Sequence, residues 1–331
     1  MRLRYTQEYA ILVYSGLSNG MDPILVTCNV NPDLDGFAGA IAYGELLKAT
    51  ATPALVGIFG EPHVEPKFVM ERCGFRYPEP VIVHSEQFKK IILVDASDLH
   101  LLDKRLNPTN VIEVIDHREV HDAHNFPYAI FQMEMVAAAS TMIAERFQEA
   151  GVEPSLMVAS LMYCAIISNT LNFKAKVAST RDYAAKEWLE QYTKLPSGFF
   201  NLMFKAKSDV AGTHLQSRLQ DNFSYFVFGR TKVGIGQLEI IGARAVAETR
   251  TSEILQFLHH MKPQFVLDHV FLSVIDLEDN TNYFVTDDSE TQSMLHDVLD
   301  LSFSGPIAMR PESIMRKETV PLIKVYVTPP V

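Results

Sequence analysis

Cysteine, basic residues and long apolar runs are all scarce in this sequence. Only three cysteines, Cys28, Cys73 and Cys164, occur in 331 residues, and none forms a Cys-x-x-Cys pair. This spacing excludes a disulfide framework and favours a reducing compartment. The 40 Asp and Glu residues outnumber the 29 Lys and Arg residues, which gives a net charge of −11. Such a chain is a poor general binder of nucleic acid or anionic membranes, although a bound metal or a local basic pocket still admits a small anionic substrate.

The apolar content is sufficient for globular cores but is nowhere continuous enough for a membrane span. The longest apolar run, residues 156–168, falls short of the roughly 20 residues that cross a bilayer. The first residues also lack the apolar length of a signal peptide. We therefore expect a cytoplasmic protein with no membrane partner. Its length predicts two domains, at about 150 residues each.

Short apolar runs alternate with helical patterns in the first part of the chain. Near-continuous β-branched runs of this kind predict a parallel sheet that is covered on both faces. The predicted strands are residues 23–28, 54–59, 91–94 and 111–115. The predicted helices are residues 37–48, 135–150, 154–168 and 180–192.

The pattern changes near residues 195–198, Leu-Pro-Ser-Gly. Beyond this point mostly local pairing is predicted: a hairpin over 224–241, a helix over 252–261, and a second hairpin from 270–276 and 283–285. The predicted fold class is α/β, with a parallel-sheet domain flanked by helices in residues 1–194. A smaller α+β domain is predicted for residues 195–331.

Polar residues follow the first predicted strand in the segment Asn29–Asp35. Asp33 and Asp35 are two positions apart, and two carboxylates this close repel each other unless a cation lies between them. A solvated turn with Asp35 as a helix cap is the alternative from this segment alone. A calcium loop is excluded, because Ala42 occupies the twelfth position, where such a loop needs a bidentate Glu.

Two more predicted strands end in similar residues. Asp95 follows the third strand, and Asp116, His117 and Arg118 follow the fourth. Histidine is a common metal ligand whose tautomer a neighbouring carboxylate can fix, and the Arg118 fork suits phosphate. Each feature alone is common as a cap or turn. Because ligands of parallel sheets gather at the carboxyl ends of the strands, the three together predict a site for a hard metal ion.

Charge favours two ions over one. Asp33, Asp35 and Asp95 bring three negative charges to one edge of the sheet, so a single divalent ion would leave a site that repels phosphate. Two divalent ions give a net positive site, and a separation of about 3.5–4 Å suits phosphoryl hydrolysis. Oxygen ligands with one imidazole suit Mn²⁺ or Mg²⁺.

Four short motifs in this order resemble those of the DHH phosphoesterase superfamily. They are Asn29-x-Asn-Pro-Asp-x-Asp35, Val94-Asp95, Asp116-His117-Arg118 and the segment 166–174. Residues 233–237 and 315–321 are similar to a DHHA2-type C-terminal domain. This group includes family II inorganic pyrophosphatases, exopolyphosphatases and prune-like proteins. The Gly-Gly-Gly-His motif of the DHHA1 branch is not present in the sequence.

The resemblance implies a role for each matching residue and hydrolysis of a phosphoanhydride, pyrophosphate or short polyphosphate, by hydroxide activated between two Mn²⁺ or Mg²⁺ ions in an interdomain cleft. The implied metal ligands are Asn29, Asp33, Asp35, Asp95, His117 and Asn169. The implied catalytic residues are Asp116, His117 and Arg118. The implied substrate-binding residues are Arg118, Lys174, Arg316 and Lys317.

Three positions depart from the usual pattern. Asn29 replaces a His of the pyrophosphatases, Arg118 replaces a second His as in prune-like proteins, and Asn169 replaces the Asp of the fourth motif. Because the amide of Asn169 carries no charge, we expect weaker binding of the second metal. A catalytically weakened relative that binds a phosphorylated ligand or partner is one alternative. A phosphodiesterase acting on short oligonucleotides or nucleotides is the other. No duplex nucleic acid partner is expected, and a homodimer is left open.

Overall fold

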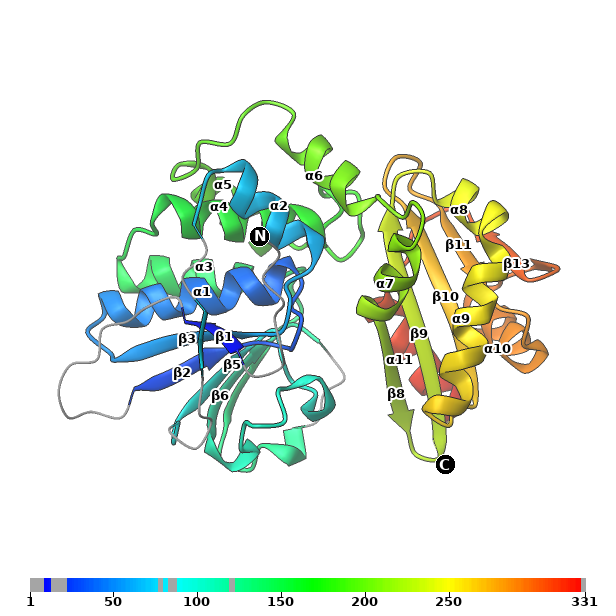
Figure 1. Cartoon of the computed structure of the whole chain (residues 1–331), viewed down its shortest axis with the longest axis horizontal. Helices are drawn as coiled ribbons and strands as arrows, with labels where there is room; N and C mark the ends of the chain where they lie inside the picture. Colours follow the sequence, from blue (N-terminus) through cyan, green and yellow to red (C-terminus); the bar gives the residue numbers. More distant parts are fainter. Residues whose placement is uncertain (1–8, 13–22, 77–79, 83–87, 119–122, 329–331) are drawn as a thin grey trace. The chain divides into compact units, whose positions relative to one another are not determined.

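The computed structural model describes residues 9–12, 23–76, 80–82, 88–118 and 123–328, and Figure 1 shows them as two compact units. Unit 1 contains the described residues up to Phe173 together with Val177–Met203, and unit 2 contains Lys174–Lys176 and the described residues from Phe204 onward. The predicted α/β fold class, with a second and smaller mixed domain, is confirmed. The predicted domain boundary between residues 194 and 195 stays a prediction.

Unit 1 is built on a seven-stranded sheet in the order β4-β1-β3-β2-β5-β6-β7. All four predicted strands are present, and they form the parallel centre of the sheet with β7. The sequence prediction missed the short strand β7. Strand β1 pairs antiparallel to both β3 and β4. The strands are β1 (Tyr9–Leu12), β2 (Ile24–Thr27), β3 (Ala54–Phe59), β4 (Pro80–Ile82), β5 (Ile91–Val94), β6 (Val111–Asp116) and β7 (Ile130–Met133).

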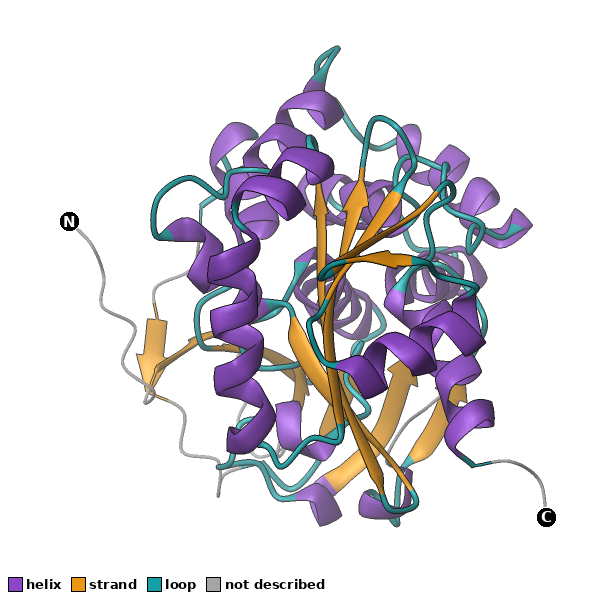
Figure 2. Cartoon of the chain, turned by 90° about the vertical axis from the view of Figure 1, so that its right-hand side faces the viewer, coloured by secondary structure: helices purple, strands orange, loops and turns teal. Residues whose placement is uncertain are grey.

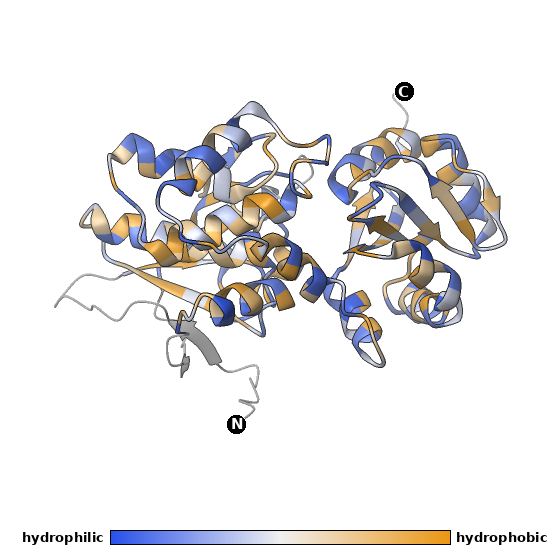
Figure 3. Ribbon diagram, turned by 90° about the horizontal axis from the view of Figure 1, so that it is seen from above, coloured by the Kyte–Doolittle hydropathy of each residue, from blue (hydrophilic) through white to orange (hydrophobic). Residues whose placement is uncertain are grey.

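Helices cover one face of this sheet (Figure 1). The helix predicted from residue 135 begins only at Ala139, because Ala138 is still extended, with φ −139° and ψ 144°. The sequence prediction missed α2. Figure 3 shows hydrophobic and hydrophilic residues together along the helices of unit 1. The helices are α1 (Leu34–Ala49), α2 (Val64–Arg72), α3 (Ala139–Ala150), α4 (Leu156–Asn169), α5 (Thr180–Glu190) and α6 (Phe199–Lys207).

Irregular segments rather than long helices pack into a second cluster against this sheet. Leu102, Leu106 and Phe126 lie in short turns, and they are buried with Leu25 and Leu93 from the central strands. Because side chains alternate along a strand, Leu93 joins this cluster while its neighbour Val94 approaches α1. The expected cover on both faces is therefore achieved by helices on one side and turns on the other.

Unit 2 contains a six-stranded sheet in the order β12-β13-β11-β10-β9-β8. Both predicted hairpins are present as β8–β9 and β10–β11, but β9 and β10 pair in parallel, which the expectation of local pairing missed. Figure 2 shows its strands with the surrounding helices. The strands are β8 (Phe223–Phe228), β9 (Thr231–Ile240), β10 (His269–Asp276), β11 (Asn282–Val285), β12 (Phe303–Ser304) and β13 (Ile307–Arg310).

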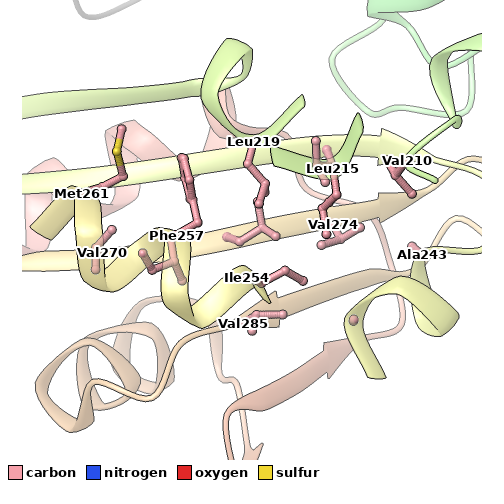
Figure 4. Packing of buried hydrophobic residues seen from close by; sticks show 14 of the residues in the cluster. Val210, Leu215, Leu219, Ala243, Ile254, Phe257, Met261, Val270, Val274 and Val285 are labelled. Atoms are coloured by element: carbon pink, nitrogen blue, oxygen red, sulfur yellow. The ribbon is translucent and has the colours of Figure 1, made fainter. Parts of the chain in front are cut away.

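The core of unit 2 lies between this sheet and the helices α7, α8 and α9. Leu219, Ile254 and Phe257 extend from helices toward Val274 and Val285 on the strands (Figure 4). The helix predicted over 252–261 is present and forms most of α9. The helices are α7 (His214–Asp221), α8 (Ala243–Thr249), α9 (Thr251–Gln264), α10 (Ser289–Leu299) and α11 (Arg316–Val327). Within the described ranges, no helix has the length and apolar character that crossing a membrane requires.

The contact between α1 and β5 gives a test of the packing. A Cβ atom at Gly39 would lie 2.7 Å from Cγ1 of the buried Val94, whose branched side chain has little freedom to move. The overpacking penalty of about 1–3 kcal/mol should exceed the helix-propensity gain of about 1 kcal/mol. We expect Gly39→Ala to lower the free energy of unfolding by about 1 kcal/mol, measured by urea denaturation. In a Val94→Ala background the same change should be neutral or stabilising, and an equal loss in both backgrounds would contradict the packing.

Candidate metal centre

The turn after β2 leads directly into α1. Asp33 is the N-cap of this helix, since its Oδ1 accepts hydrogen bonds from the backbone N–H groups of Asp35 (3.1 Å) and Gly36 (3.0 Å). The alternative interpretation of the sequence placed the helix cap at Asp35, and it is wrong because the cap is Asp33. Asp33 is exposed, whereas Asp35 is buried in the first turn of α1.

Asp35 connects the beginnings of two helices. Its carboxylate accepts hydrogen bonds from Ala139 N (2.7 Å), Ser140 N (2.9 Å) and Ser140 Oγ (2.6 Å), all in the first turn of α3. Anionic groups are stabilised at helix N-termini, and the α3 cap residue Ala138 has no side-chain acceptor of its own. The carboxylate of Asp35 is thus held rigidly at the carboxyl edge of the sheet.

Asp95 lies at the end of β5 in a left-handed conformation, with φ +54°. Its N–H donates to Ile115 O at 2.8 Å, and its carbonyl accepts hydrogen bonds from Asn29 Nδ2 (2.9 Å) and Arg118 Nη2 (2.6 Å). Asp tolerates this region better than most residues, at a conformational penalty of about 1–3 kcal/mol. The neighbouring strands therefore hold the Asp95 side chain in a conformation that the isolated chain rarely adopts.

His117 follows β6 with its ring orientation fixed. Its Nδ1 lies 3.1 Å from Val136 O, and because a carbonyl only accepts, Nδ1 carries the proton. Its Nε2 then points at Asp95 Oδ1 (3.2 Å) and Asp35 Oδ2 (3.5 Å). Asp116 holds the backbone of His117 instead of its ring, since the His117 N–H donates to its Oδ1 at 2.7 Å.

Asp35, Asp95 and His117 each offer a ligand atom, and these atoms lie within 4.8 Å of one another at buried positions. A neutral imidazole nitrogen that faces two carboxylate oxygens is unfavourable unless a proton or a cation lies between them. Two carboxylates and one imidazole suit a hard or borderline divalent ion such as Mn²⁺ or Mg²⁺. These residues therefore fit the metal that the sequence predicts.

Asn29 adds an independent observation. Among the described residues, no hydrogen-bond partner is found for its buried Oδ1 atom. Leaving such an atom unsatisfied costs about 1–3 kcal/mol. Because the amide nitrogen donates to Asp95 O, the orientation of the oxygen is fixed. An amide oxygen is a suitable ligand for a hard cation, and this supports Asn29 as a ligand.

The pKa values of the cluster reflect several negative charges that lie close together. Burial, followed by the charges of Asp95 and Asp35, raises the pKa of Asp33 to about 7. Burial and the charge of Asp95 also raise the pKa of Asp35. Burial opposes ionisation of Asp95, but Arg118 and His117 outweigh it and lower the pKa of that carboxyl. A cation among these residues would relieve the repulsion.

Arg118 is part of the same cluster. Its Nη2 lies 3.2 Å from Asp95 Oδ1, its Nη1 lies 3.2 Å from Asp98 Oδ2, and its Nε lies 3.4 Å from Asp116 Oδ1. Burial disfavours the charged guanidinium, but these three carboxylates raise the pKa of Arg118 above its usual value. The sequence prediction missed Asp98, and it missed Ser97, whose Oγ donates to Asp116 Oδ2 at 2.5 Å. Both lie within three residues after Asp95, but a Ser-Asp pair in a turn gives no specific signal.

Asn169 ends α4 beside the cluster. Its Nδ2 donates to Asp35 Oδ2 (2.9 Å) and to Ala137 O (3.2 Å). Both partners are acceptors, so the amide nitrogen faces them and Asn169 contacts the cluster as a donor. Its predicted role as a metal ligand stays a prediction.

The remaining predicted residues belong to unit 2. Lys174 Nζ donates to Leu277 O at 2.7 Å. Arg316 and Lys317 are the first two residues of α11. Arg316 Nη1 donates to Asn222 O at 2.9 Å. Burial opposes ionisation of Glu239, but Lys207, Gln237 and Lys317 outweigh it and lower the pKa of that carboxyl. The role of these residues in substrate binding also stays a prediction.

The fold and the cluster together define an α/β protein with a candidate divalent-cation site at the carboxyl edge of a parallel sheet. Residues 23–166 match the model of the DHH family, N-terminal domain, and residues 201–325 match that of the DHHA2 domain. A manganese-dependent inorganic pyrophosphatase of Methanothrix thermoacetophila is 31% identical over 258 residues, which cover 77% of this chain and 82% of the relative.

Two further relatives extend over nearly the whole chain. A Deinococcus radiodurans protein named "probable manganese-dependent inorganic pyrophosphatase" is 27% identical and aligns over 91% of this chain and 98% of its own. A crystal structure from Methanococcus jannaschii, assigned to family II inorganic pyrophosphatases, has 25% identity and a TM-score of 0.76, with 91% and 98% coverage. The chain belongs to the DHH family with a DHHA2 domain, the group that contains the family II inorganic pyrophosphatases.

Replacing Asp33 tests the electrostatic strain of the metal-free cluster. The folded carboxyl has a pKa of about 7 against an ordinary 3.8, so the folded chain loses stability as pH rises from 4 to 7. With a chelator present to remove metal, Asp33→Asn should be more stable than wild type at pH 8. The expected gain is on the order of 1 kcal/mol, because solvent screens the exposed carboxylate. The difference should vanish near pH 4, since Asn also caps helices.

Unfolding by urea at pH 4, 6 and 8 measures this difference. A difference that is equal at all three pH values would contradict the raised pKa. Saturating Mn²⁺ should reverse the order of stability, because a carboxylate at position 33 binds a cation more tightly than an amide.

Proposed function

We propose that this protein is a metal-dependent hydrolase of phosphoanhydrides, with pyrophosphate and short polyphosphate as its substrates. The observation that carries the proposal is the convergence of Asp35, Asp95 and His117 at the carboxyl edge of the sheet. The names of the relatives, manganese-dependent inorganic pyrophosphatases, support the metal and the substrate class.

In this proposal Asp33, Asp35, Asp95 and His117 hold two divalent ions, and Asn29 contributes its unsatisfied amide oxygen. When bound, such ions lower the pKa of water and neutralise charge on phosphoryl oxygens. The proton on His117 Nδ1 keeps the Nε2 lone pair directed into the cluster. Three carboxylates support two ions over one, because a single ion would leave the site negative.

Arg118 and the basic residues of unit 2 bind the phosphate groups in this proposal. The Arg118 guanidinium matches phosphate geometry and adds a charge that is independent of pH in the working range. Lys174, Arg316 and Lys317 add positive charge from the domain that clamps the substrate. Arg316 and Lys317 begin a helix, where backbone N–H groups also favour anions. In this proposal the protein acts in the cytoplasm.

A second candidate function follows from Asn169. Its amide donates to Asp35, where a charged ligand would attract a second cation. A protein with one occupied metal position would bind a phosphorylated ligand or partner without efficient turnover. The number of Mn²⁺ ions bound at saturation separates the two candidates.

Removing ligands of the cluster tests the hydrolase. Asp95→Asn and His117→Gln should each reduce phosphate release from pyrophosphate by at least about 100-fold with Mn²⁺ present, because each removes a direct ligand. Glu149→Gln is a matched control, since Glu149 is an exposed acid on α3 of the same unit. Wild-type rates in the ligand variants would remove the proposed site. A panel of tripolyphosphate, cyclic nucleotide and dinucleotide tests the substrate class.

Restoring a carboxylate at position 169 tests the second metal position. Asn169→Asp places an acid against Asp35 Oδ2 and Ala137 O, so the metal-free variant should be less stable than wild type. With Mn²⁺ the same change should raise metal affinity about 10-fold and should increase phosphate release. Calorimetric titration and thermal unfolding measure both effects. No gain in affinity would show that Asn169 is not at a metal position.

A further inference from the structure

One short segment contacts three residues of the metal centre. Val136 O accepts from His117 Nδ1 at 3.1 Å, and Ala137 O accepts from Asn169 Nδ2 at 3.2 Å. The next turn donates Ala139 N, Ser140 N and Ser140 Oγ to Asp35. The backbone of residues 136–140 therefore sets the orientation of residues from three different elements.

The backbone hydrogen bonds that this segment makes with its own neighbours are short-range, from Val136 N to Glu134 O (2.9 Å) and from Thr141 N to Ala138 O (3.1 Å). Residues 137–139 are all alanine, fully buried, and contribute no polar side chain. Ala138 is the N-cap of α3 and makes no side-chain capping bond. The segment lies between β7 and α3 and has neither a helical nor a strand ladder through residues 135–138. Its position depends on contacts from elsewhere in unit 1.

Asp182 of α5 supplies such a contact. Its two carboxyl oxygens lie 3.0 and 3.1 Å from Ala137 N, and its Oδ1 accepts from Thr141 Oγ1 at 2.7 Å. The same carboxyl accepts from Ser179 N and Ser179 Oγ, each at 2.7 Å, as part of the capping box of α5. Asp182 is 0% exposed, so water cannot replace these bonds.

We propose that Asp182 is a positioning residue for the metal centre, because its carboxyl fixes the peptide of Ala137 and thereby the segment that orients His117, Asn169 and Asp35. The N–H of Ala137 binds Asp182 while its carbonyl binds Asn169, so a shift of this residue displaces both neighbouring peptides. Val136 O then no longer lies opposite His117 Nδ1. Asp182 acts only through the segment, and its role rests on the metal-dependent function proposed above.

The capping box offers a purely local explanation for Asp182, and it makes a different prediction. If Asp182 serves only α5, then its loss and the loss of Ser179 should have the same consequences. Ser179→Ala removes the hydroxyl from the capping box but leaves the bonds of Asp182 to Ala137 and Thr141. It is therefore the matched control that separates helix capping from positioning.

Titration of Mn²⁺ into the metal-free full-length chain tests the proposal by calorimetry. Asp182→Asn can place an amide NH₂ against the backbone N–H of Ala137, which cannot accept a hydrogen bond, and it should weaken Mn²⁺ binding by about 10–100-fold. Ser179→Ala should lower the unfolding midpoint in urea and leave the Mn²⁺ affinity unchanged. Equal loss of affinity in both variants, or none in Asp182→Asn, would overturn the proposal.

Thr141 provides a second pair of variants if Asp182→Asn does not fold. Thr141→Val removes the hydroxyl donor at nearly constant volume, and Thr141→Ser keeps it. We expect Thr141→Val to weaken Mn²⁺ binding several-fold and Thr141→Ser to bind like wild type. Equal affinities in this pair would overturn the proposal whether or not Asp182→Asn folds.

The two proposals fail in distinguishable ways. A wild-type chain that binds Mn²⁺ but releases no phosphate from any anhydride would end the proposed hydrolase, while the affinity comparison at Asp182 still stands. Phosphate release by wild type with unchanged Mn²⁺ binding in folded Asp182→Asn would end the positioning role alone.

Discussion

The repulsion among carboxylates at the carboxyl edge of one sheet is the constraint on which the rest of this structure depends. Asp35, Asp95 and Asp116 are buried at this edge, the exposed Asp33 lies in the same turn as Asp35, and the pKa values of Asp33, Asp35 and Asp116 are raised. The chain offsets this repulsion with the Arg118 fork, with backbone N–H groups at two helix starts, and with an imidazole. The remaining negative charge is what a divalent cation would neutralise.

The elements that build this edge were predictable because their signals are local. Apolar runs followed by acidic turns are written in consecutive residues, so β2, β5 and β6 and their terminal Asp95, Asp116 and His117 could be found from the sequence. Pairing between distant segments leaves no such pattern, and the parallel β9–β10 pair and the edge strand β7 were missed for that reason.

Contacts made by the backbone were equally invisible in the sequence. Val136 O fixes the His117 tautomer, but any residue type supplies a carbonyl at that position. Asp182 matches the pattern of an ordinary capping box, and nothing in its neighbours indicates a bond to Ala137, 45 positions away. The three departures at Asn29, Arg118 and Asn169 were visible as residue types. The sequence does not show which amide atom of Asn169 faces Asp35. The structure shows that its Nδ2 donates to Asp35 Oδ2.

The double attachment of Asp35 has a consequence for how this protein can vary. That carboxylate accepts hydrogen bonds from the first turn of α3, belongs to the first turn of α1, and also faces His117. One side chain therefore serves both the packing of two helices and the candidate metal centre. In the proposed metal centre, a substitution at Asn29 or Asn169 would change the affinity for the ion and leave the bonds between Asp35 and α3 in place. At position 35 the two roles cannot be separated, because a residue that cannot hold the proposed ion would also lose the hydrogen bonds that join the first turns of α1 and α3.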